Sequence, residues 1–62
     1  MPKSNSVLNS IPIYESEVSN AKIIDYVDSK EDLDIIEENF DSLNAQIYHG
    51  LQIAYVRLND LK

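Results

Sequence analysis

The sequence contains no cysteine, a single glycine and two prolines. Without cysteine, neither disulfides nor thiolate metal sites can stabilise the chain. One glycine is too few to build a glycine-rich phosphate loop. No segment reaches the roughly eighteen consecutive apolar residues of a transmembrane helix, and the first six residues lack the apolar core of a signal peptide. These absences predict a cytoplasmic protein.

The chain is also short of residues and of positive charge. Its 62 residues form at most one domain, close to the lower size limit for independent folding. Self-association or a partner is the usual supplement to so small a core. The net charge of −6 argues against surfaces that bind nucleic acid or anionic membranes, since both need an excess of Lys and Arg. We therefore expect a protein partner, a homo-oligomer or both, with no direct nucleic-acid binding and no membrane binding.

What the chain does contain is hydrophobic enough for folding, because 44% of its residues are apolar. Residues 1–10 are rich in Ser and Asn and predict a mobile arm, which leaves residues 11–62 as a single small helical domain. Residues 11–15 suggest an extended segment, and Pro12 would confine it to a sheet edge or to a partner's groove. Residues 21–27 fit either a strand or two helical turns capped by Ser19. The N-terminal part is therefore an extended arm followed by a short helix or a small β-hairpin.

Residues 30–61 predict a long amphipathic helix, which makes the fold mainly α. Ser29 is a candidate N-cap, and acidic residues follow it in the first turn. Apolar residues then recur at steps of three and four, which is a helical period. They are Leu33, Ile36, Phe40, Leu43, Ile47, Leu51, Ala54, Leu58 and Leu61. One straight helix would be about 48 Å long, while a break near 41–44 or 49–50 would produce two helices.

This row of nine residues predicts a surface for self-association or for packing on a partner, because one helix cannot bury it. A second row predicts an acidic contact face opposite the first. Its members are Glu31, Asp34, Glu37, Glu38 and Asp41. The acidic face either meets a basic partner or only keeps the protein in solution. Tyr48 and Tyr55, seven residues apart, are candidate interface contacts or peripheral core residues.

The sequence offers little for catalysis. His49 is the only histidine. A lone histidine is more often a surface residue or a packing residue than a metal ligand. The acidic residues after Asp28 do not match a calcium-binding loop. Such a loop has glycine at its sixth position, and the sixth residue counted from Asp28 is Leu33. We expect no enzymatic activity, no catalytic or metal site and no cofactor.

Three functions fit these observations. The first is a non-catalytic protein–protein interaction module, a small regulator, inhibitor or assembly factor that acts through its amphipathic helix. The second is an acidic inhibitor that imitates nucleic acid and blocks a basic DNA- or RNA-binding protein. The third is a small chaperone or antitoxin whose segment Ile11–Glu15 clamps an edge strand or a groove.

Overall fold

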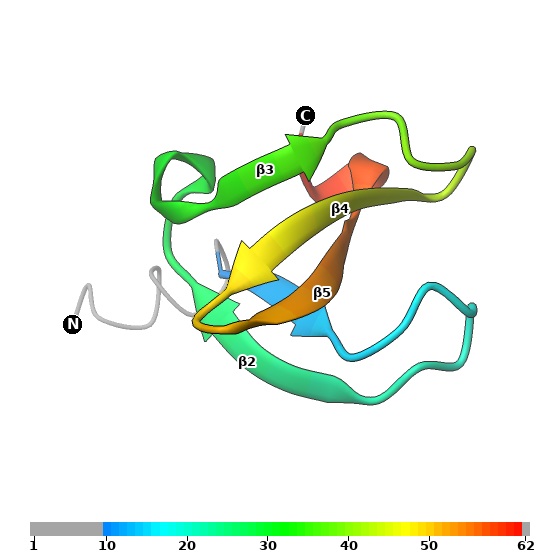
Figure 1. Ribbon diagram of the computed structural model, residues 1–62, viewed down its shortest axis with the longest axis horizontal. Helices are drawn as coiled ribbons and strands as arrows, with labels where there is room; N and C mark the ends of the chain where they lie inside the picture. The colour runs from blue at the N-terminus through cyan, green and yellow to red at the C-terminus, as the bar shows by residue number, and fades with distance from the viewer. Residues whose placement is uncertain (1–9, 62) are drawn as a thin grey trace, which may run out of the picture.

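The computed structural model describes residues 10–61, and within this range the chain forms a five-stranded antiparallel sheet (Figure 1). The elements are β1 (Ile11–Tyr14), β2 (Ile23–Val27), the 3-10 helix η1 (Lys30–Asp32), β3 (Asp34–Glu37), β4 (Asn44–His49), β5 (Gln52–Arg57) and the 3-10 helix η2 (Leu58–Leu61). The strand order is β2-β1-β5-β4-β3, so β2 and β3 are the edges. The predicted mainly α fold, with one long helix over 30–61, is therefore wrong.

The β4–β5 hairpin explains why the helix does not form. Register pairing of His49 with Gln52 leaves Gly50 and Leu51 as a two-residue loop. Gly50 has φ +66, and no non-glycine residue in the described range has a positive φ. This combination is that of a type II′ turn, whose twist matches that of the flanking strands. The predicted helix breaks at 41–44 and 49–50 are instead a loop before β4 and this hairpin turn.

The core lies on one face of the sheet, which we call the inner face. Ala45 pairs with Val56 and Ile47 with Ala54, so these four side chains point to the same side. In the described part of the chain they are buried together with Ile11, Ile13 and Leu61. Ile24, Val27, Leu33 and Leu58 pack against this cluster from its rim. The core therefore draws on both ends of the sequence.

The N-terminal part adopts the hairpin alternative, because β1 and β2 pair antiparallel. The expectation that Pro12 places its segment at a sheet edge is wrong, since β1 lies between β2 and β5. Within the described residues, β5 pairs with β1 only at Tyr14, so the proline breaks no pairing on that side. The predicted mobile arm falls on residues 1–9, outside the described residues, except for Ser10.

The predicted helix start at Ser29 exists, but only as one turn. The Ser29 Oγ accepts a hydrogen bond of 3.1 Å from the Glu31 backbone N–H and caps η1. At Leu33 the backbone is already extended, with φ −93 and ψ 141, and it continues into β3. Among residues 10–61, no helix has the length and hydrophobicity needed to cross a membrane.

Candidate functional site

The face of the sheet opposite the core, the outer face, collects aromatic side chains. Tyr14 and Gln46 both pair with Tyr55, and Tyr48 pairs with Ile53. Paired residues of an antiparallel sheet point to the same side, and Tyr55 alternates with the buried Ala54 and Val56. The outer face therefore carries Tyr14, Tyr48 and Tyr55, one from each of three neighbouring strands.

Part of this outer face is engaged in contacts within the protein. The rings of Phe40 and Tyr55 lie 5.1 Å apart and are tilted by 57°. The Gln46 Nε2 donates a hydrogen bond of 3.3 Å to the Tyr55 Oη. The guanidinium carbon of Arg57 lies 3.9 Å from the centre of the Tyr14 ring, within cation–π range. Tyr55 is therefore a peripheral packing residue, one of the two roles that its spacing predicts.

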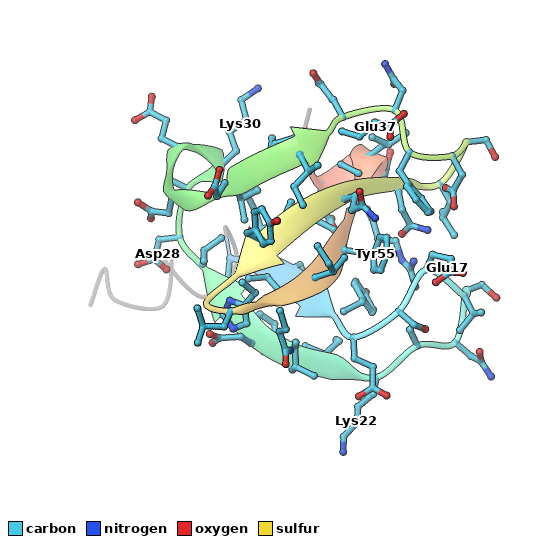
Figure 2. All side chains as sticks on the ribbon, in the orientation of Figure 1. Glu17, Lys22, Asp28, Lys30, Glu37 and Tyr55 are labelled. Carbon is cyan, nitrogen blue, oxygen red and sulfur yellow. The ribbon has the colours of Figure 1, made fainter. Side chains whose placement is uncertain are left out.

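Asn44 and Arg57 hold the loop between β1 and β2 against the sheet. Asn44 is fully buried, and its Nδ2 donates to the Glu17 carbonyl at 2.7 Å. The Arg57 Nη2 donates to the Val18 and Ser19 carbonyls at 3.1 and 3.0 Å, and Nη1 donates to the Asn44 Oδ1. In Figure 2, Tyr55 projects toward the side of the molecule on which Glu17 lies. The Arg57 guanidinium therefore stabilises the position of the β1–β2 loop against the sheet.

Asp41 plays a comparable structural part in the loop before β4. Its Oδ1 accepts hydrogen bonds from the backbone N–H groups of Leu43 at 2.8 Å and of Asn44 at 2.7 Å. The Leu43 N–H is the main cause that lowers the pKa of Asp41, and Asn44 and the nearby Arg57 charge lower it further. Asp41 was predicted as a member of the acidic contact face, and it lies with its carboxylate turned into its own loop.

Three of the exposed apolar residues lie together at the turn end of the β4–β5 hairpin. Leu51 is 104% exposed at the tip, and the outer-face pair Tyr48 and Ile53 is 51% and 39% exposed. On the inner side of the same turn is a shallow pocket of about 440 Å³, lined by Ile24, His49, Leu51 and Gln52. We call Tyr48, Leu51 and Ile53 the hairpin-end patch. It combines a convex apolar tip with an adjoining hollow.

His49 has a partner from a strand that is not adjacent in the sheet. Its Nε2 lies 3.2 Å from the Asp25 Oδ2, and this contact joins β4 to β2. Both side chains remain partly exposed. Among the described residues, no three His, Asp or Glu side chains are placed to hold a metal ion. His49 thus lines the pocket and contacts Asp25 of β2.

The predicted row of nine apolar residues does not form one surface, because its residues lie on strands, turns and both faces. Ile47, Ala54 and Leu61 are buried, and Leu33 and Leu58 pack at the rim of the core. Phe40 packs on Tyr55. Ile36, Leu43 and Leu51 are exposed in three separate segments. Only Leu51 belongs to the hairpin-end patch.

The predicted acidic face is likewise divided, since it was placed on a helix that does not exist. Glu31 lies in η1, Asp34 and Glu37 lie on β3, and Glu38 follows β3. The geometry therefore brings these four acids close to one sheet edge rather than behind the apolar row. Ile53 is the one member of the hairpin-end patch that was not named as a site. The Gly50-Leu51 pair between two segments rich in β-branched and aromatic residues was the signal that could have found it.

Comparison of the chain with protein-family models, with curated proteins and with solved structures yields no match. Evidence about function therefore comes from the surfaces themselves.

Proposed function

We propose that this protein is a non-catalytic protein-binding module whose hairpin-end patch contacts a partner protein. The observation that supports the proposal is the position of Leu51, which is fully exposed at the tip of a turn between the exposed Tyr48 and Ile53. Grouped apolar side chains on a small protein's surface are typical of interaction sites. The helical mechanism expected from the sequence has no part in this proposal.

The chemistry of the patch suits recognition. Tyrosine offers a large amphipathic surface with few rotatable bonds, so little conformational entropy is lost on binding. The backbone beneath the patch is held by the six register pairs of β4 with β5. A preorganised surface of this kind loses less free energy to ordering than a mobile loop does. The adjoining pocket can accept one side chain of the partner while Leu51 enters a hollow on the partner.

The test compares two purified variants in capture from the native host. Leu51→Asp places a charge at the centre of the patch, and Val18→Asp makes a similar change at an exposed site in the β1–β2 loop. We expect Leu51→Asp to recover roughly tenfold less of a specific partner protein, or still less, as for a central interface residue. Val18→Asp should recover as much of this partner as the wild type does. Thermal melts confirm that both variants fold.

Equal recovery of every partner by wild type and Leu51→Asp would contradict the proposal. Light scattering of the same samples distinguishes a second copy from a foreign partner. The composition also leads us to propose a cytoplasmic location, which fractionation of the host tests.

A further inference from the structure

The edge strand β3 differs from every other strand in the described range, because all four of its residues are exposed. It pairs with β4 on one side, and the described residues place no strand on its other side. Figure 1 shows β3 as the upper margin of the sheet. Backbone N–H and C=O groups along such an edge can pair with another extended chain.

The side chains of β3 divide between the two faces. Asp34 pairs with Tyr48 and Glu37 with Gln46, so both carboxylates lie on the outer face. Ile35 pairs with the buried Ile47 and is 38% exposed at the inner rim, and Ile36 occupies the irregularity between the paired positions. An added strand would therefore meet two acids on one face and an incompletely covered isoleucine on the other.

Negative charge predominates along this edge within residues 10–61. In the described part of the chain, neither Asp34 nor Glu37 forms an ion pair. Lys30, the basic residue nearest in sequence, directs its Nζ to the Leu61 carbonyl at 3.4 Å. Glu31, Asp32 and Glu38 add further negative charge in the adjoining segments. In the described part of the chain, acidic side chains therefore predominate along this edge, and those of Asp34 and Glu37 have no salt-bridge partner.

A second copy of this chain is a poor occupant of the edge. Antiparallel pairing of two β3 strands about a two-fold axis places Asp34 opposite Glu37 of the other copy, and like charges in that position are destabilising. The charges and the irregular register at Ile36 protect the edge against self-pairing. The same carboxylates attract a basic strand. They therefore disfavour pairing with a second copy and favour pairing with a basic partner.

We propose that β3 is a docking edge for an extended basic peptide segment of another protein, which adds to the sheet as a further antiparallel strand. Lysine or arginine would lie opposite Asp34 and Glu37, and an aliphatic residue between them would cover Ile35. The proposal goes beyond the hairpin-end patch, since it concerns a different strand and specifies the partner's chemistry.

The experiment uses the full chain and a synthetic peptide of alternating lysine and valine, observed by amide NMR and titration. We expect chemical-shift changes at residues 34–37 and slower hydrogen exchange of the outward β3 amides. A glutamate–valine peptide should not bind. A lysine–valine peptide N-methylated on the β3-facing side should also fail, because it lacks the donors that strand addition requires.

Two double variants test the assignment of the charges. D34K together with E37K should weaken binding of the lysine peptide roughly tenfold and allow the glutamate peptide to bind. D28K together with D60K makes the same change in net charge at positions outside β3 and should have a much smaller effect. The peptide titration reads β3 itself and needs no partner of the hairpin-end patch, so a failure of the proposed function stays distinguishable from a failure of this proposal.

Binding of the N-methylated peptide as tightly as the parent peptide would show plain charge attraction and would overturn strand addition. Shift changes centred outside residues 34–37, or equal losses in the two double variants, would overturn the assignment of this edge. Failure of the parent peptide to bind would do so as well.

Discussion

The β4–β5 hairpin and the neighbouring strand β3 differ in how much of the hydrophobic core they supply. Among the described residues, four of the seven buried apolar side chains come from the hairpin, and β3 contributes none. The hairpin has strands on both sides, whereas β3 has one neighbour. Burial in this sheet therefore follows the number of strands that flank a position.

The difference in burial between the edge and the centre of the sheet is clearest at one cross-strand pair. Ile35 and Ile47 are register partners with the same side chain, yet the first is 38% exposed and the second 1%. The residue type is the same and the two residues face each other in the sheet, so the difference comes from the neighbours that each strand meets. Substitution of Ile35 and of Ile47 is therefore the most direct test of the difference between the edge and the centre of the sheet.

The largest expected effect is at this pair. Ile47→Ala should lower the free energy of unfolding by about 2–5 kcal/mol, because it opens a cavity in the core. Ile35→Ala should cost less than about 1 kcal/mol, as expected at a partly exposed site. Urea unfolding followed by circular dichroism measures both. If Ile47→Ala proves too unstable to fold, Ile47→Val should still cost about 0.5–1.5 kcal/mol. Similar losses at the two positions would refute the division between centre and edge.

A smaller effect should sharpen the account of the hairpin. Gly50→Ala should cost about 1–2 kcal/mol, since Gly50 has φ +66 and an L-residue is strained there. No neighbouring atom lies within 4 Å of an added Cβ, so the loss comes from the backbone alone. A chemically synthesised chain with D-alanine at position 50 is the matched control and should not be destabilised. Thermal melts that rank both variants alike would argue against the type II′ turn.

The smallest effect concerns the loop that joins the edge strand to the centre. Since the folded-state pKa of Asp41 lies below its ordinary value of 3.8, its ionised form stabilises the fold. This contribution is complete above the unfolded-state pKa and is lost as the pH falls through the folded-state pKa. The difference in stability between wild type and Asp41→Asn should therefore shrink as the pH drops below about 4.

Glu38→Gln, which removes one charge from the same connection, is the control for a general effect of net charge. A stability difference for Asp41→Asn that stays constant over this acid range would show that ionisation of Asp41 has no role. Denaturant unfolding at a series of pH values measures it.

The helical prediction failed for reasons that particular residues make clear. Steps of four are even, so the same spacing fits a strand as well as a helix. Outer-face positions such as Tyr48, Ile53 and Tyr55 are apolar, so the polar–apolar alternation of a strand is hidden. Gly50, in the region where the prediction allows a break between two helices, is the residue that allows the hairpin turn.

Parts of the candidate site were within reach of the sequence, and other parts were not. The spacing of Tyr48 and Tyr55 drew attention to them, and both lie on the outer face, Tyr55 packed and Tyr48 exposed. Nothing local indicated that Asp25 would meet His49, because their strands are not neighbours in the sheet. The acids of β3 were recognised as a group, but their place at an unpaired edge depends on the strand order.

The sequence by itself determined the acidic charge, the small size of any core and the local cap at Ser29. Each depends on the residue and its immediate neighbours. Only the tertiary structure decided that Ile47 is buried while Leu51 is exposed and Ile35 lies at the rim. Burial is a property of the strands that surround a side chain, and pairings between residues far apart in the chain create it.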